Sequence, residues 1–98
     1  MKVIKMIRGF KCKKTEKLFK GQSVPAFSSF QRIAFRKLEM MEAAICLDIL
    51  KCPPGNRLEA LSGNRKGQYS IRINNQFRIC FTVENDEFYN VEIVDYHR

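Results

Sequence analysis

Four residues near the middle of the chain, Pro53-Pro54-Gly55-Asn56, separate two regions with different hydrophobic periods. Before them, apolar side chains recur at spacings of three and four, which is typical of an amphipathic helix. After them, apolar and polar residues alternate, which is typical of half-buried strands. Because proline cannot continue a helix and Gly-Asn favours a turn, helical structure must stop there. The sequence therefore predicts helices first and a sheet second, which is the order of an α+β fold.

The first half predicts one main helical region over residues 25–50, with Ser28 or Ser29 as its cap. The polar residues of this region are interpreted as a solvated helix surface: Gln31, Arg32, Lys37, Glu39 and Glu42. The apolar residues are expected on the opposite face: Phe27, Phe30, Ile33, Ala34, Leu38, Met41 and Ile45. Upstream, residues 2–8 predict a short edge strand, and residues 15–20 predict one or two helical turns.

The second half predicts three strands joined by turns at Asn74-Asn75 and at residues 84–87. The side chains expected on their apolar face are Tyr69, Ile71, Ile73, Phe77, Ile79, Phe81, Val83, Tyr89, Val91 and Ile93. This face must be covered, and the helical stripe complements it. We therefore expect a single domain over residues 1–98, with N-terminal helices packed on one face of a small twisted antiparallel sheet.

The other face of this sheet is expected to be uncovered, with Arg72 and Arg78 projecting from adjacent strands. A basic, helix-free sheet face can hold a nucleic-acid strand, although many solvated sheet faces have no function. The charge of the chain agrees with an anionic partner, since 18 Lys and Arg oppose 10 Asp and Glu and leave a net charge of +8. A basic surface that only confers solubility is the alternative.

Neither a membrane span nor a secretory leader is expected. No apolar run approaches the ~18 residues of a spanning helix, and the N-terminal residues lack a long apolar stretch and a small-residue cleavage site. We therefore expect a cytoplasmic protein.

Four cysteines, Cys12, Cys46, Cys52 and Cys80, form no C-x-x-C pair, and the one histidine lies far from them in sequence. Zinc sites need closely spaced ligands, so we expect reduced thiols, no metal site and no cofactor.

Several segments in order along the chain carry a family resemblance. They are Ile7-Arg8-Gly9-Phe10-Lys11-Cys12, Pro53-Pro54-Gly55-Asn56-Arg57-Leu58-Glu59-Ala60-Leu61, Gly63-Asn64-Arg65-Lys66-Gly67, Tyr69-Ser70-Ile71-Arg72-Ile73, Phe77-Arg78-Ile79-Cys80-Phe81 and Asp95-Tyr96-His97. In this combination the chain resembles the HigB family, a branch of the RelE/ParE toxin superfamily.

The resemblance implies a RelE-like microbial ribonuclease fold. It also implies a toxin of a type II toxin-antitoxin system that enters the ribosomal A site, cuts mRNA without a metal and stops translation. Its expected partners are the ribosome, mRNA and a HigA-like helix-turn-helix antitoxin, through which alone it would reach operator DNA. Arg78, Asp95, Tyr96 and His97 match active-site positions of the family, and Glu59 stands where some members carry histidine.

Metal-free RNA cleavage needs a base for the 2′-hydroxyl, a cation for the phosphorane and an acid for the leaving 5′-oxygen. His97 suits the acid and Arg78 suits the phosphorane. Asp95 would orient His97 or a loop, and Tyr96 would stack on a base, although Tyr96 could also simply pack at the sheet end. Glu59 is either the base or a structural ion-pair partner, and the sequence leaves both open.

Four further cations are assigned to RNA phosphates: Arg57, Arg65, Lys66 and Arg72. The alternative for the first three is a solvated loop. Lys11, Lys13, Lys14 and Lys17 form another basic cluster, which would touch ribosomal RNA or aid solubility.

Three alternatives remain open, of which one is a degenerate toxin with weakened activity, as Glu59 at a position where some members carry histidine permits. The other two are rival functions. A ParE-like, gyrase-targeting toxin would share the fold without needing Asp95-Tyr96-His97. A non-catalytic ribosome- or RNA-binding module would keep the basic face and tolerate loss of His97, which could then be a frayed terminal residue.

Overall fold

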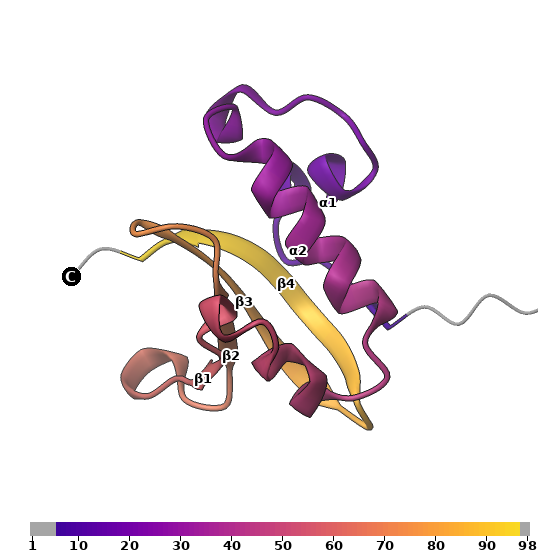
Figure 1. Ribbon diagram of the computed structural model, residues 1–98, viewed down its shortest axis with the longest axis vertical. Coiled ribbons are helices and arrows are strands. Elements are labelled where there is room, and N and C mark those ends of the chain that lie inside the picture. Colours follow the sequence, from indigo (N-terminus) through magenta and orange to yellow (C-terminus); the bar gives the residue numbers. More distant parts are fainter. Residues whose placement is uncertain (1–5, 97–98) are drawn as a thin grey trace, which may run out of the picture.

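The computed structural model describes residues 6–96 of the 98-residue chain. Two α-helices, α1 (Lys13–Phe19) and α2 (Gln31–Ala43), precede an antiparallel sheet of four strands in sequence order (Figure 1). The strands are β1 (Glu59–Ala60), β2 (Tyr69–Arg72), β3 (Phe77–Glu84) and β4 (Glu87–Asp95). Four 3-10 turns lie between these elements, at Pro25–Phe27, Leu47–Lys51, Pro54–Asn56 and Gly63–Arg65. The expected α+β fold is confirmed.

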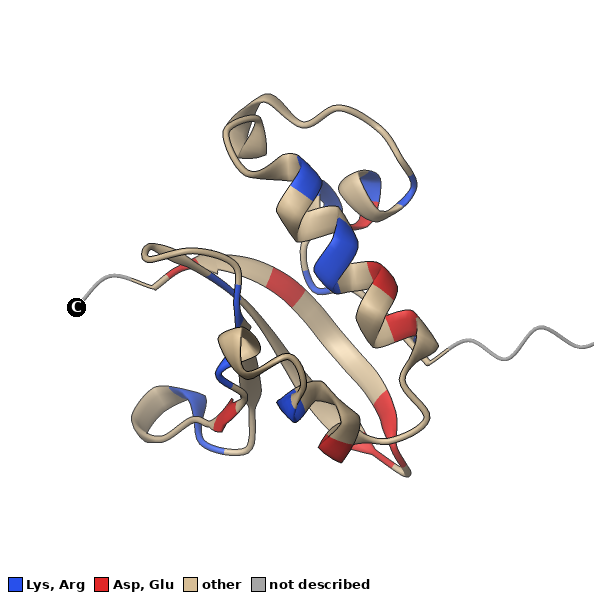
Figure 2. Cartoon of the chain, in the orientation of Figure 1, with Lys and Arg blue, Asp and Glu red and all other residues tan. Residues whose placement is uncertain are grey.

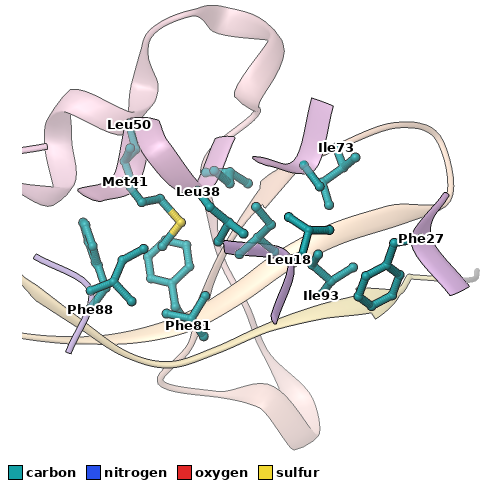
Figure 3. Close-up of a cluster of buried hydrophobic side chains, with 14 of the residues drawn as sticks. Leu18, Phe27, Leu38, Met41, Leu50, Ile73, Phe81, Phe88 and Ile93 are labelled. Carbon is teal, nitrogen blue, oxygen red and sulfur yellow. The ribbon is translucent and has the colours of Figure 1, made fainter. Parts of the chain in front are cut away.

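The helices cover one face of the sheet, and the core fills the space between the two layers (Figures 1 and 3). Leu38 and Met41 of α2 and Leu18 of α1 are fully buried there. From the sheet, Phe81 and Phe88 meet edge to face with their ring centroids 5.2 Å apart. Within the described residues, no helix is long and apolar enough to cross a membrane.

The single helical region predicted for residues 25–50 is wrong in its continuity. The backbone of Ala44 is extended, so α2 ends at Ala43. Ile45 therefore does not lie on the apolar face of the helix, and it is 75% exposed. Ile33 is 46% exposed, because the buried stripe runs through the next residue, Ala34. Neither Ser28 nor Ser29 is the N-cap, which is Phe30 without a side-chain cap hydrogen bond.

The polar residues of α2 are not simply a solvated surface. Glu42 Oε1 accepts hydrogen bonds from the backbone N–H groups of Met6 and Ile7, each at 2.9 Å. Gln31 bonds the backbone of the preceding loop, and Lys37 donates to Asn56 Oδ1. These polar side chains therefore attach other segments to the helix.

A bulge changes the inward face of β4. Phe88 is fully buried, whereas Tyr89, which the alternation places inward, is half-buried and its hydroxyl donates to Glu87. The register shifts between Cys80 and Thr82 of β3, and Asn90 opposite has a left-handed φ of 53°. An extra residue in one strand reverses the alternation from there on, so Val91 and Ile93 face the core as predicted.

The N-terminal segment runs beside β4. Ile7 and Phe10 form parallel bridges with Phe88 and Val91, so strand pairing extends past the end of the predicted strand at residues 2–8. Residues 2–5 of that prediction lie outside the described residues. The predicted turns of residues 15–20 are confirmed as α1, where Thr15 Oγ1 accepts the backbone N–H of Ile93 at 3.0 Å.

Candidate active site

A cleft of about 620 Å³ opens where β1, the β2–β3 turn and the end of β4 meet. Its lining residues are polar or charged by type and come from segments up to 39 residues apart in sequence, between positions 57 and 96. The lining residues are Arg57, Glu59, Arg72, Asn74, Asn75, Gln76, Arg78 and Tyr96. Three arginines therefore face this cleft together with one carboxylate. Figure 2 shows the Lys and Arg residues of the chain in blue and the Asp and Glu residues in red.

Arg78 lies on β3 with its guanidinium held at three points. Its Nε donates to Ser70 Oγ at 2.7 Å, and its Nη2 donates to the Arg57 carbonyl at 2.7 Å. The same Nη2 lies 3.4 Å from Oε1 of Glu59. These contacts occupy Nε and Nη2 and, among the described residues, leave Nη1 without a hydrogen bond. The fork is thus fixed in direction with one end available to a ligand.

Arg78 is only 9% exposed, which corrects the expectation of a solvated arginine on an uncovered sheet face. Neighbouring Cys80 on the same face is fully buried. Arg65 crosses to this face, where its Nη1 lies 3.3 Å from Glu92 Oε2. The segment between β1 and β2 therefore covers part of the sheet face that the sequence leaves open.

Glu59 reaches the cleft because β1 pairs with β2. In that register Glu59 lies opposite Ser70, the residue that accepts the Nε donor of Arg78. The Glu59 side chain is 43% exposed. It is consequently both an ion-pair partner of Arg78 and a carboxylate that a ligand in the cleft can reach.

Arg72 lies directly opposite Arg78 in the register of β2 and β3. Its Nη2 donates to Asn75 Oδ1 in the β2–β3 turn. Asn74 closes this turn, because its Oδ1 accepts the backbone N–H groups of Gln76 and Phe77, each at 2.8 Å. Two like charges in this arrangement favour an anion in the cleft between them.

Tyr96 follows β4 and lies against Arg78. The guanidinium carbon is 5.6 Å from the ring centroid, a distance at which a cation interacts with an aromatic face. The Tyr96 backbone N–H donates to the Gln76 carbonyl at 2.6 Å. Asp95 accepts a hydrogen bond from Gln76 Nε2 at 3.0 Å, and so connects the strand end to the β2–β3 turn.

The structure brings together Arg57, Glu59, Arg72, Arg78 and Tyr96, and places Asp95 beside them against Gln76. It does not bring Arg65 or Lys66 into the cleft lining: Arg65 pairs with Glu92, and Lys66 is exposed. His97 lies outside the described residues.

Sequence reasoning missed three lining residues, Asn74, Asn75 and Gln76. The first two were interpreted only as a turn. The available signal was a run of three uncharged amides that begins two residues after Arg72 at the end of a strand, because amides are ligands for nucleic acid as well as turn formers.

All four cysteines lie within the described residues and are free thiols. Burial raises the pKa of the Cys80 thiol above its ordinary value of 9.0. Across residues 6–96, no group of three or more His, Cys, Asp or Glu side chains could hold a metal ion.

The arrangement has the charge and donor geometry that suit a phosphate diester. Arg72 and Arg78 supply positive charge, the Arg78 fork has fixed geometry, and Glu59 can accept a proton. Tyr96 offers an aromatic face for a base next to that charge.

Comparison with protein families identifies one match, described as a RelE-like toxin of type II toxin-antitoxin system HigB, over residues 8–97. Toxin HigB-1 of Vibrio cholerae is 52% identical over 54 residues, which cover 55% of this chain and 57% of that protein. An uncharacterized protein of Haemophilus influenzae is 38% identical over 64 residues, 65% of this chain and 63% of its own length. The chain thus spans less than two thirds of either relative.

Two solved structures from Staphylococcus aureus share the fold. The YoeB dimer superposes with a TM-score of 0.54 at 18% identity, covering 95% of this chain and 99% of that one. The YoeB–YefM complex gives a TM-score of 0.52 at 18% identity, with 94% and 98% covered.

Proposed function

Because this chain belongs to the HigB-like family of RelE-like toxins from type II toxin-antitoxin systems, we propose that it is a ribosome-dependent mRNA endoribonuclease. It cuts mRNA in the ribosomal A site without a metal, and so stops translation and growth. The observation that carries this proposal is the cleft itself, in which Arg72, Arg78 and Glu59 stand together beside Tyr96.

Substrate binding uses the fixed charges of the cleft. The scissile phosphate approaches the open Nη1 end of the Arg78 guanidinium, and Arg72 neutralises it or the adjoining phosphate. Arg57 adds a third arginine to the lining of the cleft. The base stacks on Tyr96, whose ring already packs against Arg78.

Cleavage then needs only groups of the protein and the substrate. The 2′-oxygen attacks phosphorus while Glu59 takes its proton, and Arg78 stabilises the charge that gathers on the phosphorane oxygens. The bond from phosphorus to the 5′-oxygen breaks, and His97 donates the proton that this oxygen needs. The products are a 2′,3′-cyclic phosphate and a 5′-hydroxyl.

We propose a helix-turn-helix antitoxin of the HigA type as the partner that holds the toxin inactive and links it to operator DNA. We also propose that the protein acts in the cytoplasm, where ribosomes are available. Arg65 and Lys66, which lie outside the cleft lining, then contact RNA phosphates only at the rim of the bound complex.

The test is single-turnover cleavage of mRNA on programmed ribosomes, with 5′ ends mapped and end groups identified. We expect wild-type protein to cut ribosome-bound mRNA much faster than naked mRNA, and to leave cyclic phosphate ends. His97→Ala should lower the rate by roughly 10²-fold, as expected for loss of a general acid. Wild-type protein and His97→Ala should also be compared for growth arrest, with and without the antitoxin.

Three results would redirect the assignment. Full rate in His97→Ala would remove this residue as the acid. Full toxicity without mRNA cleavage, accompanied by inhibition of gyrase, would favour the ParE-like alternative. Ribosome binding without either activity would leave a binding module.

A further inference from the structure

The buried side chain of Asn56 connects the helical layer with the wall of the cleft. Asn56 is fully buried and directly precedes Arg57. Its Oδ1 accepts a hydrogen bond from Lys37 Nζ on α2. Its Nδ2 donates to the carbonyl oxygens of Leu50 at 3.1 Å and Cys52 at 3.3 Å.

Only a carboxamide satisfies this environment. The two backbone carbonyls require a donor, and the Lys37 ammonium requires an acceptor, so aspartate or leucine would leave groups unsatisfied. The sulfur of Met40, also on α2, lies 3.1 Å from Nδ2. Asn56 thus holds α2 and the 3-10 turn Leu47–Lys51 together at one point.

This anchor lies one peptide away from the group that orients Arg78. Arg57 has a left-handed φ of 46°, which is uncommon for a residue other than glycine and must be held by its surroundings. Its carbonyl accepts the Nη2 donor of Arg78 at 2.7 Å. A rotation of the backbone at Asn56 and Arg57 would therefore withdraw this acceptor and turn the guanidinium.

We propose that Asn56 is a positioning residue of the active site: by fixing the Arg57 carbonyl, it sets the direction of the Arg78 guanidinium without touching RNA. This inference rests on the proposed nuclease function for its kinetic consequence. Its structural part, the orientation of Arg78, holds for the free protein and can be tested alone.

Lys37 completes the same connection from α2. Burial and the charge of Arg72 both lower the pKa of Lys37, so its position costs free energy as a cation. The hydrogen bond to Asn56 Oδ1 supplies an acceptor for the ammonium at this position. Lys37→Met removes the donor to Asn56 Oδ1 but leaves in place both hydrogen bonds that Nδ2 donates to the carbonyls of Leu50 and Cys52, and so gives a milder version of the same perturbation.

The kinetic test compares Asn56→Asp with Thr15→Val in single-turnover cleavage on programmed ribosomes. Thr15 of α1 is a matched control, since it too is fully buried. Its hydroxyl accepts the backbone N–H of Ile93 on β4, where α1 packs against the sheet. Both substitutions should lower the melting temperature. Only Asn56→Asp should lower the cleavage rate, by roughly 10- to 100-fold, which is what a small misplacement of a catalytic group costs.

A double-mutant cycle separates positioning from support of the fold. If Asn56 acts through Arg78, adding Asn56→Asp to Arg78→Ala should not slow cleavage further. Multiplication of the two rate losses would overturn the proposal, as would equal rate losses in Asn56→Asp and Thr15→Val. If Asn56→Asp does not fold, Lys37→Met takes its place in the same cycle.

NMR of the free protein gives a readout that does not need nuclease activity. The Nη2–H signal of Arg78, which reports the hydrogen bond to the Arg57 carbonyl, should be sharp and protected from solvent exchange in wild type, and should broaden and exchange faster in Asn56→Asp. An unchanged signal would refute the positioning role. A changed signal in a protein that cuts no RNA would refute the proposed function while leaving the orientation of Arg78 by Asn56 intact.

Discussion

The Nη2 atom of Arg78 and the Oε1 atom of Glu59 lie 3.4 Å apart at the cleft, with Arg78 nearly buried and Glu59 43% exposed. This geometry joins the two roles that the sequence leaves open for Glu59. The carboxylate is an ion-pair partner of the guanidinium and, because of its exposure, also accessible to a substrate. The pair thus places the proposed base next to the proposed phosphorane ligand.

Arg78→Ala should reduce both activity and stability. The loss of a fixed cation at the phosphorane should cost about 2–4 kcal/mol of transition-state stabilisation. The substitution also leaves the buried Ser70 hydroxyl and the Arg57 carbonyl without their donor, at about 1–3 kcal/mol of unfolding free energy. Single-turnover rates and urea unfolding measure the two effects.

Arg78→Lys is the companion variant. An ammonium cannot donate to both partners and to a phosphate with the geometry of the fork, so it should restore charge but only a part of the rate. Wild-type rate in Arg78→Lys would show that charge alone suffices.

Glu59→Gln should separate proton transfer from ion pairing. The amide keeps the shape and can still occupy the position beside Arg78, but it accepts protons poorly. We expect the cleavage rate to fall by roughly 10²-fold or more. Because the ion pair is partly exposed, the free energy of unfolding should change by less than about 1 kcal/mol. A rate close to wild type would make Glu59 a structural partner only.

Arg72→Ala should weaken RNA docking in a salt-dependent way. Arg72 lines the cleft, and each phosphate neutralised on a single strand contributes about −0.7 to the slope of log affinity against log salt. The slope of log affinity against log salt should therefore be shallower by about 0.7 in Arg72→Ala than in wild type. Lys20→Ala is the control, since Lys20 lies after α1, away from the cleft lining, and pairs with Glu16. Equal slopes for both variants would show that the basic excess acts diffusely.

Cys80 should make the fold sensitive to alkali. Burial raises the pKa of its thiol above the ordinary 9.0, so the folded protein keeps a proton that the unfolded chain has lost at higher pH. The free energy of unfolding should then fall as pH rises above about 9. Urea unfolding of wild type and Cys80→Ala across this range gives the test: the alkaline loss should be smaller in the variant. At pH 8, thiol reagents should modify exposed Cys52 well before Cys80.

The α+β fold could be predicted because its elements are encoded locally. The period-two runs gave β2, β3 and most of β4, and the helical stripe gave the buried residues Ala34, Leu38 and Met41. The break in α2 at Ala44 and the bulge near Asn90 could not be predicted, since each depends on how one layer fits the other. Spacing in the sequence does not contain that information.

The candidate site, like the fold, could be predicted only in part from the sequence. Residue types and their order along the chain identified Arg57, Glu59, Arg72, Arg78 and Tyr96 as members of one family pattern, and all five line the cleft. Only the tertiary structure placed Arg65 against Glu92, added the amides of the β2–β3 turn, and buried Arg78. The reason is physical: a side chain's chemistry belongs to its residue type, whereas its exposure and partners depend on strand register and on loops that return from elsewhere in the chain.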